Sequence, residues 1–457
     1  MKQDIFEDGR IFEFVDPSNT FKDKLSKKIN GSYDKDIIIK FGVDPTRPDI
    51  HLGHAVIFRF LRKMQDLGCK VVFLVGDFTA RIGDPTGKSK VRPEIDQKEI
   101  EHNMNTYLEQ VGKVLSTDPK VFSWIRNSDW FVGISDIFGE EGSMVKLPDP
   151  LTGEVPSNTF IGKSILYENS RMQRTHLGKQ GVVGITLSTF IWTLKKITHQ
   201  NLIDRDMFQD RIKNGEELYM HEMMYPVLQG IDSFVLHQIY GSCDLEIGGT
   251  DQTFNMLLGR EVMKFNAVEP QSVISMKLLR GTDGKEKMSK SLSNYISIND
   301  TASDIFGKVM SIPDDLMPEY FDLCTDMTKE EKEAVKSDIN KKENLKSIKM
   351  NLAAKIVEIY HGNMAASSAF SMFENVFSNG DFPEDAQVLE ASTGEKLVDV
   401  FVLNKIVESK SEARRLIEAG ALSEYPDKKI LDTAVVVEEG EKKFRLGKKI
   451  FFVVKSK

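Results

Sequence analysis

Cysteine is scarce in this sequence, and its scarcity narrows the possible classes of protein. The 457 residues include only Cys69, Cys243 and Cys324, an odd number at widely separated positions. Such a set argues against a disulfide scaffold or a Cys-x-x-Cys zinc site and is typical of a reducing cytosol. We therefore expect a cytoplasmic protein with no protein-bound structural metal.

Long apolar runs are also lacking. No stretch approaches the ~20 apolar residues that span a bilayer, and the N-terminal residues contain no apolar signal-peptide core. The sequence therefore predicts no membrane segment. Hydrophobic residues still make up 40% of the chain, which is enough for sizeable cores. The length is that of about three domains.

An excess of positive charge is missing as well. Lys and Arg total 61 against 69 for Asp and Glu, giving a formal net charge of −8. Taken alone, this balance argues against a generic nucleic-acid-binding protein. The total hides an asymmetry, because residues 397–457 contain 13 basic and 10 acidic residues whereas the remaining 396 contain 48 and 59. An acidic body is therefore followed by a basic C-terminal segment.

The first half of the chain alternates short apolar runs with helical periodicity. Residues 37–43 and 71–75 are typical of buried strands, and residues 51–67 between them repeat apolar positions at helical spacing up to Gly68. A strand, a helix and a strand in succession predict a parallel sheet. We expect further strands at 121–125 and 272–278, and a long helix at 216–240 with Pro226 inside it.

Together these patterns predict an α/β protein with several domains. A Rossmann-like parallel-sheet domain is expected over residues 1–300, with an insert at about 126–215 that contains a loop-rich extra segment at about 135–181. A helical domain is expected over 301–378, a polar linker over 379–396 and a small α+β domain over 397–457.

His51-Leu52-Gly53-His54 occupies the predicted start of the first helix. A helix N-terminus is a natural phosphate site, two imidazoles add hydrogen-bond donors, and Gly53 lets a ligand approach the backbone closely. A metal site is a less favoured alternative because no nearby Cys or His-x-x-Glu pattern completes the ligand set. Taken alone, the histidines could also be incidental residues of a helix surface.

A second motif, Lys287-Met288-Ser289-Lys290-Ser291, follows the glycine-flanked loop 281–286. A loop with lysines three positions apart can fold over a polyphosphate and neutralise charge on a leaving group. An ordinary solvated lysine run is the alternative for this string by itself. In combination, however, the two motifs resemble the signature motifs of class I aminoacyl-tRNA synthetases.

A third basic segment, residues 83–89, comes close to the phosphate-binding G-x-x-x-x-G-K-[ST] pattern. Ile82 stands where the first glycine of that pattern belongs, so we reject a P-loop. Lys88 and Arg92 remain candidate phosphate ligands.

Polar residues also recur at helical spacing near the middle of the chain. Tyr225, Gln229 and Asp232 stand at i, i+4 and i+7 and therefore share one face of the predicted helix, which is either a solvent face or a cavity face. Downstream, a predicted strand ends in Gly248-Gly249-Thr250-Asp251-Gln252. Paired glycines let a nucleoside lie against the backbone, and an acidic side chain can accept from ribose hydroxyls.

With these motifs, the chain resembles bacterial tyrosyl-tRNA synthetases over nearly its whole length. The resemblance implies a tyrosine–tRNA ligase that uses L-tyrosine, ATP with Mg²⁺, and the tRNA for tyrosine. It also implies a homodimer formed through the insert, a helical domain that binds the anticodon, and a C-terminal RNA-binding domain.

The resemblance further assigns roles to individual residues. Asp84, Tyr225 and Gln229 would hold the α-ammonium of tyrosine, and Asp232 its phenolic hydroxyl. The full set implied for tyrosine binding is Gly42, Asp84, Tyr225, Gln229, Asp232 and Gln252. The set for ATP binding is Asp44, Gly53, Gly249, Asp251, Lys287, Ser289 and Lys290, and the catalytic set is Thr46, His51, His54, Lys88, Arg92, Lys287 and Lys290.

Two departures from the family pattern stand out. Many members have a tyrosine that shares the phenolic hydroxyl at the position where this chain has Lys40. A second bacterial branch also has lysine there, which leaves the partner of Asp232 open. The extra length within the insert has no assigned role, and a surface excursion is the simplest interpretation.

The C-terminal segment predicts a short helix. Ser409 and Glu412 fit a capping box, and Gly420 is suited to end the helix. Lys410, Arg414 and Arg415 lie on or near one exposed face, where a solvated surface is the default interpretation. The pattern at 411–417 resembles the small RNA-binding module of a ribosomal small-subunit protein, which implies tRNA contacts through these three residues.

Two alternative functions stay open. Tryptophanyl-tRNA synthetases share the two signature motifs, and a non-catalytic RNA-binding or splicing factor could be built on a synthetase scaffold. The 248–252 string and the basic C-terminal segment favour tyrosine, and the intact histidine and lysine motifs argue against lost catalysis.

Overall fold

The computed structural model describes residues 5–46, 49–85, 97–131, 136–138, 144–146, 185, 187–203, 206–342, 344–375, 382, 386–426, 428–447 and 450–456. These residues form two compact units. The first comprises Met1–Thr301 with Ser311–Leu352, and the second comprises Ala302–Met310 with Ala353–Lys457.

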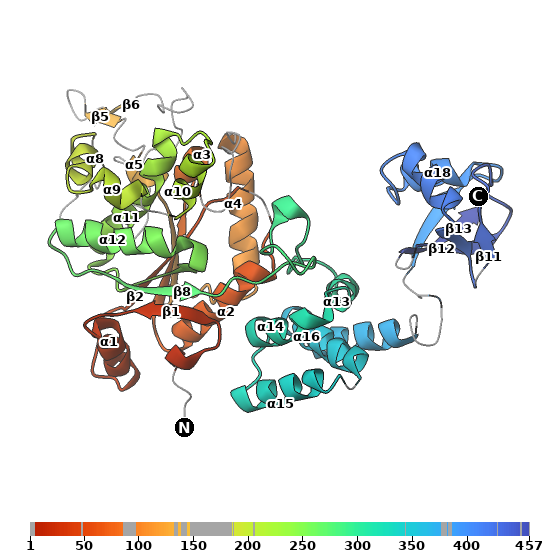
Figure 1. Cartoon of the computed structure of the whole chain (residues 1–457), viewed down its shortest axis with the longest axis horizontal. Coiled ribbons are helices and arrows are strands. Elements are labelled where there is room, and N and C mark those ends of the chain that lie inside the picture. The colour runs from red at the N-terminus through yellow and green to blue at the C-terminus, as the bar shows by residue number, and fades with distance from the viewer. Residues whose placement is uncertain are drawn as a thin grey trace. The chain divides into compact units, whose positions relative to one another are not determined.

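A six-stranded sheet forms the centre of the first unit (Figure 1). Its order is β1 (Ile11–Val15), β8 (Ser272–Met276), β7 (Leu245–Gly249), β2 (Ile38–Val43), β3 (Lys70–Val75) and β4 (Phe122–Arg126). Only β1 runs antiparallel to its neighbour. The predicted strands at 37–43, 71–75, 121–125 and 272–278 are therefore confirmed, with ends shifted by at most two residues.

Helices cover both faces of this sheet. Val72 and Leu74 join a core with α11 (Met220–Tyr240) and α12 (Thr253–Phe265), whereas Phe41 and Phe73 face α2 (Leu52–Asp66) through the ring of Phe58. The predicted first helix is confirmed, and Gly68 follows it with φ 85°, a backbone conformation that favours glycine. The predicted helix 216–240 begins later, at Met220, where Glu222 accepts a hydrogen bond from the Tyr219 backbone N–H.

The close approach of α11 to α12 depends on glycine. A Cβ atom added at Gly230 would lie 2.8 Å from Cγ2 of Val262 and 3.3 Å from the Cα of Gly259. The two helices therefore pack backbone to backbone at this point, and a side chain at position 230 has no room.

We expect Gly230→Ala to destabilise the first unit by about 1–3 kcal/mol, because overpacking a tight contact forces neighbouring groups apart. Urea unfolding followed by tryptophan fluorescence measures this, since all three tryptophans lie in the first unit. Gly9→Ala is the matched control, because a Cβ at Gly9 meets nothing within 4 Å. Equal midpoints for the two variants would contradict the prediction.

Further helices are distributed over both units. They are α1 (Thr20–Ile29), α3 (Thr79–Ile82), α4 (Gln97–Val111), α5 (Ser128–Phe131), α8 (Leu187–Leu194), α9 (His199–Ile203), α10 (Asp206–Lys213), α13 (Ala302–Met310), α14 (Met317–Cys324), α15 (Lys329–Asn340) and α16 (Leu345–Glu374). Of these, helix α13 belongs to the second unit, α16 spans the boundary, and the others belong to the first unit. Helices α13 to α16 lie within 301–378, where helices are predicted, but the two compact units divide this segment between them, so a separate helical domain there stays a prediction. Of the predicted extra segment, β5 (Asp136–Phe138) and β6 (Met144–Lys146) are described and pair antiparallel; the rest of 132–184 lies outside the described residues.

The second unit ends in a five-stranded sheet. Its order is β11 (Lys428–Ile430), β10 (Leu422–Glu424), β12 (Glu441–Leu446), β13 (Ile450–Ser456) and β9 (Gln387–Ala391), with α17 (Leu397–Leu403) and α18 (Lys410–Glu418) packed on it. The prediction that 379–396 is only a linker is wrong, because β9 pairs with β13 in parallel and buries Leu389. The strand is short and lies within a segment rich in polar and acidic residues, so its local pattern did not indicate a strand.

The predicted helix near Ser409 is confirmed as α18, and Gly420 follows it with φ 71°. Ser409 Oγ accepts a hydrogen bond from the Glu412 backbone N–H at 3.2 Å. The Glu412 carboxylate accepts from the N–H of Glu408. Only the serine half of the predicted capping box therefore forms as expected.

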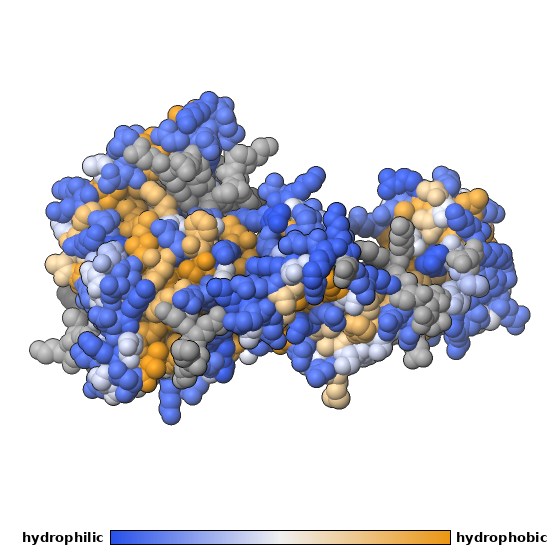
Figure 2. Space-filling model, turned by 60° about the horizontal axis from the view of Figure 1, so that its bottom comes forward, coloured by the Kyte–Doolittle hydropathy of each residue, from blue (hydrophilic) through white to orange (hydrophobic). Residues whose placement is uncertain are grey.

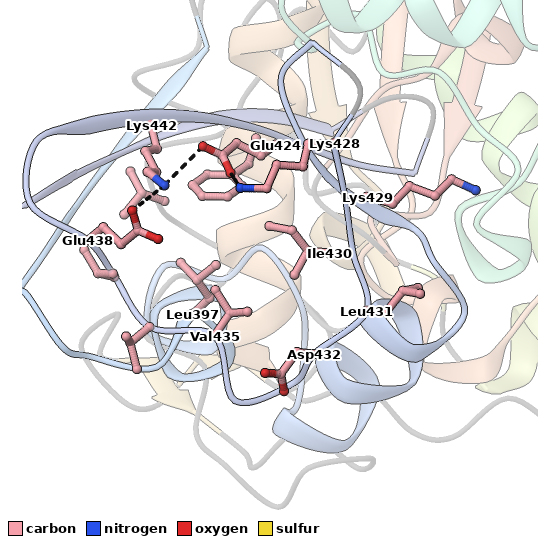
Figure 3. A pocket seen from close by; sticks show the side chains of 14 residues that line it. Leu397, Glu424, Lys428, Lys429, Ile430, Leu431, Asp432, Val435, Glu438 and Lys442 are labelled. Atoms are coloured by element: carbon pink, nitrogen blue, oxygen red, sulfur yellow. Dashed lines mark hydrogen bonds and ion pairs between the residues drawn. The ribbon is translucent and has the colours of Figure 1, made fainter.

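An open groove of about 250 Å³ lies beside β11 in the C-terminal sheet (Figure 3). Apolar side chains such as Leu397, Ile430 and Val435 line it. Lys442 pairs with Glu424 at 3.2 Å and with Glu438 at 2.6 Å, as the dashed lines in Figure 3 show. The charges at its rim thus neutralise one another.

The surface is mostly hydrophilic on the face that Figure 2 shows, with hydrophobic residues exposed among charged ones on the first unit. Within the described part of the chain, no helix combines the length and apolar character that crossing a bilayer requires.

Candidate active site

The candidate residues gather at the carboxyl ends of the parallel strands. Asp44 follows β2, Gly76 follows β3, Asn127 follows β4, and Gly249 ends β7. Ligands of open α/β sheets bind in the crevice at this edge. The topology therefore brings residues that are distant in the sequence to one place.

Helix α11 carries a polar stripe that consists of Tyr225, Gln229 and Asp232. This stripe faces the protein and not the solvent. Tyr225 and Asp232 are buried, with 6% and 3% of their surfaces exposed. The Tyr225 hydroxyl donates to Oδ2 of Asp44 at 2.8 Å, and Thr79 Oγ1 donates to the other oxygen, Oδ1, at 2.8 Å. Gly76 leaves room for this contact, because a Cβ there would lie 2.1 Å from Asp44 Oδ1.

Three of the residues predicted to bind tyrosine belong to one chain of amide hydrogen bonds. Gln252 Nε2 donates to Oδ2 of Asp84 at 2.6 Å. Asn255 Nδ2 lies 3.0 Å from the side-chain oxygens of both Gln252 and Gln229. Gln229 Nε2 in turn donates to Glu246 Oε1 at 3.1 Å. Asn255 therefore connects Asp84 and Gln252 to the α11 stripe.

Asp232 has two donors that the sequence did not indicate. Trp130 Nε1 donates to Oδ1 at 2.9 Å, and Asn127 Nδ2 approaches Oδ2 at 3.4 Å. Burial raises the pKa of Asp232 to about 7, against the opposing effects of the positive charge of Lys40 and of the two hydrogen bonds. Trp130 and Asn127 are thus hydrogen-bond partners of the Asp232 carboxylate itself.

Lys40 takes no part in that contact. Its ammonium forms an ion pair with Glu246 and donates to the Gln229 carbonyl oxygen and to Ser233 Oγ. The side chain is completely buried, so these groups supply the whole of its solvation.

The two histidine rings lie against each other at the start of α2, tilted by 35°. Their ring centroids are 3.9 Å apart, and the His51 backbone N–H donates to Nδ1 of His54 at 3.4 Å. Burial, reinforced by the positive charges of Lys290 and Lys287, lowers the pKa of His54 to about 3. The pKa of His51 is lowered well below its usual value, mainly by burial. Both rings are therefore neutral at physiological pH.

Gly53 between them is needed for their packing, because a Cβ there would lie 3.0 Å from His51 Nδ1. Among the described residues, no group of three or more His, Cys, Asp or Glu side chains is placed to hold a metal ion.

The lysine loop is held against the histidine motif. Met288 is buried, and a Cβ at Gly53 would lie 3.7 Å from the Cβ of Met288. The side chain of Asn294 fastens the loop, since it accepts from the Ser289 backbone N–H at 2.8 Å and donates to Asp283 at 2.8 Å. A side chain at Gly281 would collide with this amide.

Both lysines of the loop contact residues of other elements. Lys287 forms an ion pair with Asp251 at 2.7 Å. Lys290 Nζ lies 5.1 Å from the ring centroid of Tyr107 on α4, a cation–π contact. The positive charges of both lysines contribute to the lowered pKa values of His51 and His54.

The remaining predicted residues divide into two groups. Gly42 lies at the end of β2, and Thr46 lies two residues beyond Asp44. Lys88 and Arg92 lie outside the described residues.

The family model "tRNA synthetases class I (W and Y)" matches residues 32–138 and 184–378. The chain belongs to this family. Curated members named tyrosine–tRNA ligase include one from Francisella tularensis, 36% identical over 94% of this chain and 93% of the relative. Another, from Thermotoga maritima, is 37% identical over 91% of this chain and 89% of the relative.

Solved structures show the same fold. A C-terminally truncated mitochondrial tyrosyl-tRNA synthetase from Aspergillus nidulans covers 82% of this chain, with 93% of that structure matched, a TM-score of 0.56 and 19% identity. The corresponding truncated enzyme from Coccidioides posadasii has a TM-score of 0.53 at 20% identity, over 80% of this chain and 90% of that structure.

Within this class I fold, several polar residues of the site were missed by sequence reasoning. They are Thr79, Asn127, Trp130, Glu246 and Asn255. Asn127 could have been found, because it lies two residues beyond a predicted strand of a parallel sheet, near the strand end where ligand-binding residues gather. Trp130, one turn later, carries no such signal.

Proposed function

We propose that this protein is a tyrosine–tRNA ligase. It activates L-tyrosine with ATP to tyrosyl-adenylate and pyrophosphate, and then transfers tyrosine to the terminal ribose of its tRNA. The observation that carries the proposal is the buried Asp232, an ionisable acceptor placed at the end of a polar helix face and suited to a phenolic hydroxyl. The named relatives support the same reaction.

The mechanism relies on alignment and charge. A tyrosine carboxylate oxygen bonds to the α-phosphorus of ATP while the bond to pyrophosphate breaks; a ribose hydroxyl of tRNA then attacks the tyrosyl carbonyl and AMP leaves. A carboxylate needs no general base at neutral pH. The protein must orient the reactants and stabilise charge on the phosphates.

The residues divide between these tasks. Asp84, Tyr225 and Gln229 would bind the α-ammonium, Asp232 the phenol, and Gly249 and Asp251 the ribose. The phosphates would contact Thr46, His51, His54, Lys287 and Lys290, with Lys88 and Arg92 as further candidates. ATP brings Mg²⁺ bound largely through its phosphates. Because the pKa of His54 is about 3, the histidines would act as neutral hydrogen-bonding groups.

ATP–pyrophosphate exchange across the twenty amino acids tests this function. We expect exchange with tyrosine only, followed by charging of a tRNA for tyrosine. Exchange with tryptophan instead would favour the tryptophanyl enzyme, and RNA binding without any exchange would favour a non-catalytic factor.

Tyrosine activation should depend on pH through Asp232. Its pKa of about 7 means that the carboxylate ionises as the pH rises through neutrality, and an ionised acceptor binds a phenol more strongly than the neutral acid. We expect kcat/KM for tyrosine to rise between about pH 6 and 8 and Asp232→Asn to lack this inflection. A flat wild-type profile, or the same inflection in the variant, would contradict the assignment.

The raised pKa of Asp232 also makes the stability of the folded state depend on pH. The folded state binds the Asp232 proton more tightly than the unfolded state, in which the pKa of an aspartate has its ordinary value of 3.8. The stabilising contribution of Asp232 is therefore complete below pH 3.8 and is lost as the pH rises toward 7. Ionised Asp232 costs stability at the pH where it binds substrate best.

We propose a homodimer that forms through helices of the insert and the start of α11. α8, α10 and the start of α11 expose Ile191, Trp192, Ile212 and Met220, with 40–69% of each surface accessible. Exposed large apolar groups of this kind are typical of protein interfaces.

We expect Trp192→Glu to convert the dimer to a monomer, because it places a charge in an apolar contact. Sedimentation velocity measures this. Phe12→Glu is the control, since Phe12 is 65% exposed on β1 at the edge of the sheet. A wild-type monomer, or a variant that stays dimeric, would reject this interface.

We propose that the tRNA contacts two parts of the chain. The helical segment 301–378 would bind the anticodon, and the C-terminal domain would bind another part of the tRNA. Lys410, Arg414 and Arg415 are exposed on α18, whose opposite face buries Ala413 and Ile417. Such residues would contact phosphates and position the tRNA without reading its sequence. Translation would place the enzyme in the cytoplasm.

A further inference from the structure

A buried ion pair lies beneath the face of α11 that is assigned to tyrosine. Lys40 on β2 and Glu246 on β7 are register partners on neighbouring parallel strands, and Lys40 Nζ lies 2.8 Å from Glu246 Oε1. Their exposed fractions are 0% and 2%. Removing two charges from water is costly, so a pair this deep needs nearly complete hydrogen bonding.

The Lys40 ammonium has that complete set. Besides Glu246, it donates to the Gln229 carbonyl oxygen at 2.8 Å and to Ser233 Oγ at 2.8 Å. An ammonium group has three protons, and all three are used. Lys40 therefore has no donor left for a substrate or for Asp232, and any effect on catalysis must act through its neighbours.

Glu246 connects Lys40 to the side-chain amide of Gln229. Its Oε1 accepts from Lys40 and from Gln229 Nε2 at 3.1 Å, and its Oε2 accepts from Ser233 Oγ and from Gln271 Nε2. An ionised carboxylate can only accept hydrogen bonds. The Gln229 amide must therefore present its nitrogen to Glu246.

The opposite end of the amide is then fixed as an acceptor. Gln229 Oε1 points toward Asn255 Nδ2, 3.0 Å away, and a carbonyl oxygen has a second lone pair for another donor. A substrate ammonium offers only donors. If the amide flipped, its nitrogen would face that ammonium and repel it.

We propose that the Lys40–Glu246 ion pair is a positioning element for amino-acid recognition, which orients the Gln229 amide so that its oxygen accepts from the substrate α-ammonium. This inference rests on the proposed tyrosine activation and names a role for two residues that do not touch the substrate.

The test replaces both charges at once. Lys40→Met/Glu246→Met keeps the side-chain volumes and leaves no unpaired buried charge, so the chain is expected to fold. Calorimetry should show L-tyrosine binding weakened about 10- to 100-fold, the value of one hydrogen bond to a charged group. Binding of 3-(4-hydroxyphenyl)propanoate, which lacks the ammonium, should not change. The preference for tyrosine over phenylalanine should also persist, because Asp232 is intact.

A third substitution separates orientation from general damage. Gln229→Glu supplies an acceptor that cannot flip, so in the double variant it should restore tyrosine binding. In the wild-type background the same change places a second carboxylate beside Glu246 and should weaken binding. A merely structural role for the pair would not reverse the sign of this effect between the two backgrounds.

A matched pair outside the site serves as the control. Lys24 and Asp244 form an ion pair at 2.8 Å, at the amino end of β7. Lys24→Met/Asp244→Leu should leave tyrosine binding and discrimination against the desamino analogue unchanged. The single variant Lys40→Gln is the substitute if the main double variant does not fold, because glutamine can still donate to Glu246. It should also lose discrimination between L-tyrosine and the desamino analogue, but by a smaller factor.

The inference is overturned if the variants bind tyrosine and the desamino analogue in the wild-type ratio, or if Gln229→Glu acts alike in both backgrounds. Because binding needs no catalysis, a protein that binds tyrosine but exchanges no pyrophosphate defeats the proposed function alone. A wild-type protein that does not bind tyrosine defeats both.

Discussion

Replacing Asp232 by alanine should remove most of the preference for tyrosine over phenylalanine. In tyrosyl-tRNA synthetases generally this discrimination is about 10⁵ and needs no editing. It arises because a site built to bind a hydroxyl is left with an unpaired buried polar group when phenylalanine enters. In this chain Trp130 and Asn127 already donate to Asp232, and the phenol would add the donor that phenylalanine lacks.

Pyrophosphate exchange with the two amino acids measures the effect as the ratio of their kcat/KM values. We expect that ratio to fall by at least about three orders of magnitude in Asp232→Ala, with a far smaller change in the urea midpoint. Asp244→Ala is the control, since Asp244 is also buried but lies at the other end of β7. Unchanged selectivity in Asp232→Ala would refute the assignment of the phenol.

Substitution of Lys287 by alanine should have the second largest effect. Charge develops on the departing pyrophosphate only as the reaction proceeds, so a lysine placed there stabilises the transition state more than bound ATP. We expect kcat for tyrosyl-adenylate formation to fall about 10²- to 10³-fold, with little change in KM for tyrosine. Single-turnover kinetics with quenched flow separates this step from product release.

The same loop supplies a control for this prediction. Lys285 is exposed two residues earlier and contacts no other candidate site residue in the described structure. Lys285→Ala should retain nearly wild-type rates. Equal losses at the two positions would indicate a general effect of loop charge and not a role for Lys287 at the phosphates.

Local periodicity was enough to predict the framework of the first unit. The strands around residues 37–43 and 71–75, and the helix between them, are encoded in consecutive apolar residues and in Gly68. The face shared by Tyr225, Gln229 and Asp232 followed from helical geometry alone. Whether that face met solvent or protein depended on how α11 packs, which spacing does not determine.

Contacts between distant segments could not be predicted in this way. Trp130 reaches Asp232 across 102 positions of sequence, and the pairing of Lys40 with Glu246 depends on the register of two strands that are not consecutive. β9 was missed for the same reason, since this five-residue segment becomes a strand only when β13 provides a partner. Each case is a tertiary interaction that overrides a weak local signal.

The contact between Gly230 and α12 limits how the proposed tyrosine site could be redesigned for other amino acids. A larger substrate side chain cannot be accommodated by moving α11 outward, because its backbone already lies against Gly259 and Val262. Space must come from trimming side chains such as Trp130 or Asn127, which also hold Asp232 in place. Directed evolution toward bulkier tyrosine analogues should therefore accumulate changes at the end of β4 and in α5, and leave the helix pair intact.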